Sequence, residues 1–222
     1  MEAVILTIVF FVLAALGLGV WWFSSDRVGK RRLQSVASTP IESAAEGALV
    51  KVTGTLSLAD HPELEGPLTG RRCVGYVVEV KERTQSGAKA NWDTIVMTED
   101  AVAFVVEDAT GRALVKAAGA HLVLVRDGHV HSGALSDHAE RAKDFLMRQG
   151  TESENVLRLK KALRYEEGVL EQGEEVSILG VANWEPVPAT LRRDGDATDA
   201  KWLVLSAPSN GQLTISDDPT TI

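Results

Sequence analysis

One uncharged stretch near the amino terminus constrains this chain more than any other feature. Residues 3–23 carry no charge over 21 positions, and Thr7 is the only clearly polar residue among them. A helix of that length is about 31 Å long, which matches the hydrocarbon thickness of a bilayer. The stretch ends in Trp21-Trp22-Phe23, as is typical where hydrocarbon meets headgroups. The pattern predicts a transmembrane helix over residues 3–23, beside which the rest of the chain works.

A cleaved signal peptide is the alternative interpretation. Such peptides have basic residues before the apolar core and small residues at the cleavage site. Here residues 1–2 hold no Lys or Arg, and two tryptophans end the stretch, which favours a retained anchor. Residues 24–38 are interpreted as a basic juxtamembrane tether. Its basic side chains are those of Arg27, Lys30, Arg31 and Arg32. The positive-inside rule then predicts that residues 1–2 lie outside the cytoplasm and that the domain after the tether lies inside it.

Composition limits the function classes that remain. The chain has 222 residues with a formal net charge of −8. The length left after the anchor suffices for one sizeable hydrophobic core or two small ones. The acidic balance argues against nucleic acid as a partner, because binding phosphates needs a basic face. The one cysteine, Cys73, excludes an internal disulfide and fits a reducing compartment. The expected partner is a protein or a second copy of this chain.

Strand signals dominate residues 39–216, so the expected fold class is mainly β (α+β). Val74, Tyr76 and Val78 alternate with smaller or polar residues, which is typical of a strand with one buried face. The expected strands are 49–53, 74–81, 94–98, 102–107, 114–115, 121–125, 176–179, 202–205 and 213–215. The expected core residues are Val50, Val52, Val74, Tyr76, Val78, Phe104, Val106, Leu114, Val176, Ile178 and Leu205. Residues 217–222 are expected to be a frayed terminus.

Helical signals are fewer. Residues 39–42, Thr-Pro-Ile-Glu, predict a short helix with a Thr39 cap closed by Glu42. Residues 136–148 predict an amphipathic helix. Val156, Leu159 and Leu163 recur at helical spacing, so the segment 164–167 that follows is interpreted as a helix terminus. One or two amphipathic helices are therefore expected against the sheet.

An internal echo suggests how the strands are organised. Residues 47–54 and 173–180 share the pattern G-x-x-V-x-[VI]-x-G, and each is followed later by a strand, a glycine-containing turn and another strand. Such an arrangement suits a small Greek-key barrel. Two barrel-like half-repeats packed together are predicted, and one fused sheet is the alternative.

Several stretches occur in an order typical of one family. They are Thr39-Pro40, 47–54, 67–76, Trp92, 104–111, 164–167 and 173–180. Together they resemble the GIDE domain, also called the beside-a-membrane domain, over about residues 38–206. The domain is known from a mitochondrial RING-type ubiquitin ligase and from many bacterial and archaeal proteins. The resemblance implies a position beside a membrane. In the ligase a RING performs the ubiquitin chemistry, and its two zinc sites need clustered cysteines and histidines. This chain has Cys73 alone, so ligase activity is not carried over.

No catalytic residue, cofactor or metal site is predicted. Cys73 begins an apolar strand and is interpreted as a small buried hydrophobe. His129, His131 and His138 offer a weak metal pattern, because no strong ligand spacing follows them. The sequence contains neither a Gly-rich phosphate loop nor a recognisable catalytic triad.

The strongest candidates for function are side chains that commonly anchor interfaces. The proposed interaction surface consists of Arg71, Arg72, Glu79, Arg83, Trp92, Tyr165, Glu166 and Trp184. The leading hypothesis is a membrane-anchored, non-enzymatic module that binds a protein partner. The alternative is a ubiquitin-ligase-like protein or another enzyme subunit, by analogy with the family.

Overall fold

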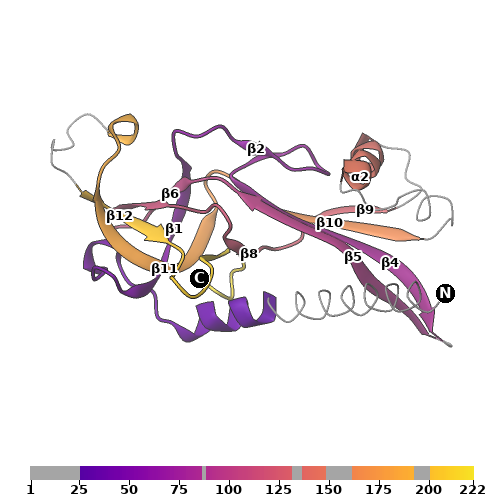
Figure 1. Ribbon diagram of the computed structural model, residues 1–222, viewed down its shortest axis with the longest axis horizontal. Coiled ribbons are helices and arrows are strands. Elements are labelled where there is room, and N and C mark those ends of the chain that lie inside the picture. The colour runs from indigo at the N-terminus through magenta and orange to yellow at the C-terminus, as the bar shows by residue number, and fades with distance from the viewer. Residues whose placement is uncertain (1–25, 87–88, 132–136, 149–161, 193–200) are drawn as a thin grey trace, which may run out of the picture.

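The computed structural model describes residues 26–86, 89–131, 137–148, 162–192 and 201–222 (Figure 1). Strands dominate, as predicted from the sequence. The strands are β1 (Leu49–Leu58), β2 (Leu64–Glu65), β3 (Arg72–Cys73), β4 (Gly75–Ser86), β5 (Lys89–Ala101), β6 (Phe104–Glu107), β7 (Arg112–Val115), β8 (His121–Val123), β9 (Gly128–His131), β10 (Leu163–Leu170), β11 (Glu175–Pro186), β12 (Lys201–Ser206) and β13 (Thr214–Ser216). The helical elements are a helix over residues 26–35, the 3-10 turns η1 (Ile41–Ser43) and η2 (Ala189–Leu191), and α2 (Asp137–Arg148).

The predicted span over residues 3–23 lies outside the described residues. Within the residues that are described, no helix is both long enough and apolar enough to cross a bilayer.

Five strands close into a barrel. Hydrogen-bonded neighbours follow the order β1-β6-β7-β12-β11, and β11 pairs back with β1. The β7–β12 pair is parallel and the other four pairs are antiparallel. Strands β13 and β8 extend the sheet from β11. The barrel is filled by fully buried apolar side chains, among them Val52, Phe104, Ile178, Leu203 and Leu205. Burial of each such side chain stabilises the fold by about 1.5–3 kcal/mol.

The two copies of the repeated motif pair with each other instead of forming separate barrels. Strands β1 and β11 run antiparallel, with Val52 opposite Ile178 and Gly54 opposite Val176. A pseudo-twofold axis through the Val52–Ile178 pair therefore relates the two copies. Beyond this shared segment β1 pairs with β6, and β11 pairs with β12. The predicted half-repeats thus build one barrel between them.

The glycines of the motif have matching structural roles. Gly47 and Gly173 open the two copies with φ angles of 72° and 91°, a left-handed conformation that glycine adopts at little cost. Gly54 and Gly180 close them where a neighbouring strand approaches. A Cβ on Gly54 would lie 2.3 Å from a β6 carbonyl oxygen, and one on Gly180 would lie 2.9 Å from a β12 carbonyl oxygen. The repeated sequence therefore encodes a repeated backbone shape.

A second, four-stranded sheet has the order β5-β4-β10-β9. All its pairs are antiparallel, and α2 lies over one of its faces (Figure 1). The apolar side chains between that face and α2 are Leu68, Val78, Val80, Ala142, Phe145, Leu146, Leu163 and Tyr165. Helix α2 agrees with the helix predicted over residues 136–148, whose first residue lies outside the described range.

Residues 163–170 correct the sequence interpretation, because they form the strand β10 and not the end of a helix. Leu163, Tyr165 and Val169 alternate inward and are buried. Glu167 occupies the inward position between Tyr165 and Val169, so a charged residue interrupts the apolar alternation. The period-two signal was hidden for that reason, and the spacing of Leu163 with the preceding residues favoured a helix instead.

The segment expected to be a polar tether contains a helix packed against the domain. Residues 26–35 are helical, and Leu33 is fully buried. A Cβ on Gly29 would lie only 3.0 Å from the side chain of Val123 in β8, so the helix backbone approaches the domain closely. Lys30 Nζ forms an ion pair of 2.5 Å with Asp218. The tether is therefore part of the folded structure.

The carboxyl-terminal residues are not frayed, contrary to the expectation for 217–222. Thr221 is buried, and its carbonyl oxygen accepts a hydrogen bond of 2.8 Å from Ser177 Oγ. Asp218 accepts from the Thr220 backbone N–H at 2.9 Å, which forms a turn. Gln34 of the docked helix donates to the Thr220 carbonyl at 3.2 Å. The terminus is held because the 26–35 helix packs over it.

The short helix predicted at residues 39–42 exists as η1, but it is not capped as expected. Pro40 occupies the N-cap position, and no side-chain cap forms there. The free backbone N–H groups are taken by the turn after β6 instead. Ile41 N donates to Asp108 Oδ2 at 2.8 Å, and Glu42 N donates to Thr110 Oγ1 at 3.2 Å. A distant turn therefore replaces the predicted capping box.

The predicted core is mostly confirmed. Of the core residues expected from the sequence, Tyr76 and Leu114 are only half-buried, and the rest are buried. Tyr76 lines a cleft beside α2, and Leu114 packs against a small apolar cluster outside the barrel. Both lie on apolar faces that are incompletely covered.

Candidate interaction surface

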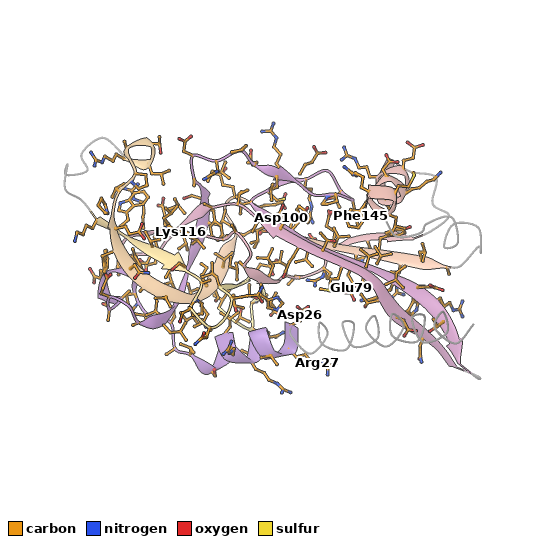
Figure 2. The ribbon with its side chains drawn as sticks, in the orientation of Figure 1. Asp26, Arg27, Glu79, Asp100, Lys116 and Phe145 are labelled. Carbon is orange, nitrogen blue, oxygen red and sulfur yellow. The ribbon has the colours of Figure 1, made fainter. Side chains whose placement is uncertain are left out.

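One face of the four-stranded sheet gathers charged and aromatic side chains from three strands. Glu79 on β4 lies opposite Glu166 on β10, and Lys81 lies opposite Arg164. Because side chains alternate along a strand, these four share the face that points away from α2. Figure 2 shows Glu79 on the side of the sheet remote from Phe145 of α2. We call this the polar face, and it consists of Glu79, Lys81, Arg83, Trp92, Thr94, Arg164 and Glu166.

Lys81 is the centre of the polar face. Its ammonium lies 2.7 Å from Glu166 Oε2 and 3.1 Å from Glu79 Oε2. Thr94 Oγ1 donates a 2.5 Å hydrogen bond to Glu79. Burial alone would lower the pKa of Lys81, but the hydrogen bond to Glu166 and the pairing with Glu79 outweigh it, and the pKa is raised. The lysine therefore stays charged and holds two carboxylates in fixed positions.

An aromatic contact lies next to this charge cluster. The Arg164 guanidinium carbon lies 4.6 Å from the centre of the Trp92 ring, within the range of a cation–π interaction. The Nε atom of Arg164 is buried and makes no hydrogen bond among the described residues. Stacking on Trp92 fixes the arginine, while its NH1 lies 3.8 Å from Glu166. The result is a rigid aromatic and cationic pair, partly open to solvent.

The opposite side of β10 carries a buried carboxylate with a structural role. Glu167 has no solvent exposure. It accepts hydrogen bonds from the backbone N–H groups of Leu68 and Thr69 at 2.7 and 3.1 Å, and from the Thr69 hydroxyl. A Cβ on Gly66 would lie 2.9 Å from the carboxylate. Glu167 therefore fixes the loop between β2 and β3 against the sheet.

Comparison with known protein families shows the family to which the chain belongs. A family model described as GIDE, E3 ubiquitin ligase, matches residues 76–213, which is more than half of the sequence. The chain belongs to the GIDE family. The match begins in β4 and ends just before β13, so it includes the polar face, Glu167 and the barrel strands from β6 to β12. No curated protein and no solved structure matches this chain.

The GIDE fold brings only part of the predicted surface together. Glu79, Arg83, Trp92 and Glu166 lie on the polar face. Tyr165 lies on the opposite face, buried under α2, and burial raises the pKa of its hydroxyl. Neighbouring residues of one strand point to opposite faces, and this separates Tyr165 from Glu166.

The other predicted residues lie elsewhere in this GIDE chain. Arg71 forms a two-bond pair with Asp127 at 2.6 and 2.8 Å, and it also contacts Glu171 at 3.2 Å. The hydrogen bond from Arg71 holds the pKa of Asp127 below its ordinary value. Arg72 is exposed and lies 3.3 Å from Glu63. Arg71 therefore joins the β2–β3 region to Asp127 and Glu171, Arg72 contacts a residue just before β2, and neither arginine joins the polar face.

Trp184 belongs to the barrel. It lies on β11, where its Nε1 donates a 3.0 Å hydrogen bond to the Ala44 carbonyl. Its backbone N–H donates to Glu46 at 2.8 Å. The side chain packs against the barrel core, so its contacts hold the segment before β1 in place.

Sequence reasoning missed three residues that organise these sites. Lys81 and Arg164 were not predicted as site residues, because their partners are cross-strand neighbours far away in the sequence. Glu167 was placed at a helix end. The stretches 67–76 and 164–167, both part of the family resemblance, were the available signal, since Glu167 binds the loop that contains Leu68 and Thr69.

Cys73 is buried on β3. Burial raises the pKa of its thiol to about 12, and the nearby Glu167 carboxylate acts in the same direction. A thiol in that state is not a nucleophile at neutral pH. Among the described residues no group of three or more His, Cys, Asp or Glu side chains is placed to hold a metal ion.

Two of the hollows on the surface of the described residues have several charged side chains in their linings. One of about 600 Å³ lies between α2 and the β2–β3 loop, where Arg141, Asp144 and Arg148 face Glu65. The other, of about 500 Å³, is lined by Asp127, Glu174, Glu175 and Asp217 together with apolar side chains. The described residues that line these two hollows include no histidine, cysteine, serine or lysine.

Proposed function

We propose that this GIDE chain is a membrane-anchored, non-enzymatic interaction module that binds a protein partner through the polar face. The observation that carries the proposal is the ordered group of Lys81, Trp92 and Arg164 on a rigid sheet. Aromatic residues and arginine are enriched at protein interfaces, and they contribute most where their side chains are already held in place.

The charge pattern indicates the chemistry of the partner. The net charge of −8 disfavours nucleic acid. On the polar face, Lys81 is already paired with two carboxylates, whereas Arg83 is exposed and Arg164 lies over an aromatic ring. Such a surface suits a protein that offers both an acidic and an apolar group. A second copy of the chain is one such protein.

The proposal places the domain at the cytoplasmic side of a membrane. It rests on the uncharged run 3–23 and on the basic side chains after it, since Lys and Arg stay on the cytoplasmic side. The anchor is tested by carbonate extraction, because an integral span keeps the full chain in the membrane pellet. A cytoplasm-active reporter fused after Ile222 tests the orientation, and activity of a periplasm-active reporter there would reverse it.

The polar face is tested by photo-crosslinking of the full chain in its native membranes. A photoreactive residue at Arg83, which is exposed on the polar face, should give a discrete crosslinked product. That product should disappear in the Trp92→Ala variant, because the side chain that fixes Arg164 is lost. Arg72→Ala, an exposed arginine away from the polar face, is the matched control. Crosslinking that survives Trp92→Ala but not Arg72→Ala would move the interface to the β2–β3 loop.

A ubiquitin-ligase-like role is the second candidate, because the matching family model carries that description. Zinc-based ubiquitin transfer needs clustered thiolate and imidazole ligands, and the 222 residues contain one cysteine and five histidines. The proposal therefore assigns ubiquitin transfer, if the family role extends to this chain, to a bound partner. Autoubiquitination by the purified chain with its upstream enzymes, or zinc at one equivalent or more, would favour intrinsic ligase activity.

A further inference from the structure

The helix over residues 26–35 has two chemically different sides. Positions three or four apart share one side of a helix. The inward side consists of Asp26, Gly29, Lys30 and Leu33, which are buried or half-buried. The outward side consists of Arg27, Val28, Arg31, Arg32 and Ser35, which are exposed. We call this outward set the basic strip.

The inward side fixes the helix to the domain by charge as well as packing. Asp26 lies 3.3 Å from Arg126 and 3.4 Å from His121 Nε2. At the next turn of the helix Lys30 pairs with Asp218 at 2.5 Å. Rotation of the helix about its axis would bury arginine and break these pairs. The basic strip must therefore face away from the domain.

The basic strip lies at the edge of the molecule and close in sequence to the predicted membrane span. The helix forms one border of the molecule (Figure 1), and Arg27 lies at that border at the end from which the helix begins (Figure 2). Residue 26 follows the uncharged run 3–23 by only three positions. The strip carries three arginines in a chain whose net charge is −8. An anionic surface therefore attracts the basic strip. The same surface repels the rest of the chain, because the net charge of the chain is negative.

We propose that the basic strip lies flat against anionic phospholipid headgroups, with the helix held between the bilayer and the domain. The proposal rests on the anchor of the proposed function. Because the inward side is clamped, a flat helix fixes which side of the domain faces the membrane. The domain then has one orientation over the bilayer and does not swing on a flexible tether.

Two positions on the strip distinguish a flat helix from an upright one. Val28 and Ser35 are seven residues apart, which is about 10 Å along a helix. The full chain is reconstituted in lipid nanodiscs with a bimane label on Val28→Cys or Ser35→Cys, and a nitroxide on the lipid headgroup quenches the label. Cys73 is buried with a thiol pKa of about 12, so it does not compete for the label. In discs with anionic phosphatidylglycerol a flat helix gives equal quenching at both positions.

A charge reversal tests the cause of that geometry. In Arg31→Glu/Arg32→Glu the Ser35 label should lose its quenching, because each basic residue near an anionic surface contributes about fivefold to the association. Arg72→Glu/Arg192→Glu reverses two exposed arginines outside the strip and should leave the quenching unchanged. Zwitterionic discs should reproduce the effect of the strip variant without a mutation.

Strong quenching at Val28 with none at Ser35 in anionic discs would show an upright helix and overturn the proposal. Equal quenching in zwitterionic and anionic discs would also overturn it, because charge would then play no part. The anchor is judged separately by carbonate extraction, which strips proteins held only by headgroup contacts. A chain that resists carbonate but leaves Ser35 unquenched refutes the basic strip and retains the anchor.

Discussion

The barrel and the four-stranded sheet bury their apolar faces in different ways. In the barrel, β1 and β11 close the sheet on itself, and the side chains inside it are buried on all sides. The four-stranded sheet does not close on itself, and among the described residues α2 covers one of its faces. Its other face carries Lys81, Trp92 and Arg164. The closed region supplies stability, and the open region supplies surface.

The two regions are nevertheless joined through their strands. The core of the barrel includes Val74, just before β4, Val77, near the start of β4, and Leu170, at the end of β10. The open sheet therefore grows out of the barrel core at one end and depends on α2 at the other. This predicts that a destabilising substitution in the barrel core also unfolds the four-stranded sheet. A destabilising substitution under α2 should unfold only the region around α2.

The largest expected effect tests that dependence. Phe104→Asp places an unpaired charge at a fully buried position in the barrel and should cost more than about 5 kcal/mol, which prevents cooperative folding. Val78→Asp is the matched change at a fully buried position under α2. It should release α2 and leave the barrel protected. Hydrogen exchange of the full chain in detergent measures both, and equal loss of protection in the two variants would make the regions one cooperative unit.

A smaller loss is expected from the buried carboxylate on the open sheet. Glu167→Ala removes the buried carboxylate that accepts hydrogen bonds from the backbone N–H groups of Leu68 and Thr69 and should lower the free energy of unfolding by about 2–4 kcal/mol. Glu185→Ala is the barrel counterpart, and its ion pair with Lys116 is half exposed, so at most about 1 kcal/mol is expected. Denaturant unfolding measures the difference, and similar losses would remove the special role of Glu167.

The symmetry of the barrel can be tested with its closing glycines. Gly54→Ala and Gly180→Ala each force a Cβ into a neighbouring strand and should cost about 1–3 kcal/mol by overpacking. Because the two sites are related by the pseudo-twofold axis, their losses should be similar. Thermal unfolding compares them directly. If one variant kept its stability and the other lost much of it, the repeat would be symmetric in sequence but not in packing.

The smallest effect is a pH dependence located outside both sheets. Burial raises the pKa of Asp217 from 3.8 to about 6, while a hydrogen bond from Val125 N–H opposes the change. A raised folded-state pKa means that the group favours folding most below pH 3.8, and that this contribution is lost as the pH rises through about 6. Asp217→Asn should therefore stabilise the chain at pH 7 more than at pH 4.5. An equal shift of the unfolding midpoint at both pH values would exclude this titration.

Structural features that depend on residues close in the sequence were predicted correctly. Features that depend on contacts between distant residues were missed. The strands and α2 follow from local periodicity. The echo at residues 47–54 and 173–180 revealed related strands, but local patterns carry no information on whether such copies pair with each other. Glu167 interrupted the alternation of β10, because a carboxylate was needed inward to bind the loop at Leu68. A functional or structural polar group in a core position is where pattern reasoning fails for a physical reason.

The candidate surface shows the same limit. Trp92 and Glu166 were identified as the residue types that anchor interfaces, and both lie on the polar face. Their organiser, Lys81, was not identified, because its two carboxylates come from different strands. Tyr165 was included because the segment 164–167 was interpreted as a helix terminus, yet the segment is a strand, and adjacent residues of a strand face opposite ways.

The pairing of β1 with β11 also means that the barrel cannot close until most of the chain has been synthesised. Strand β1 begins at Leu49 and its partner β11 begins at Glu175, so the partner leaves the ribosome long after β1. At ordinary rates of translation that delay is about 6–25 s. Throughout it the apolar side of β1 has no permanent cover, and the barrel cannot close. The nascent chain must therefore be protected from aggregation until the second copy of the motif has been made.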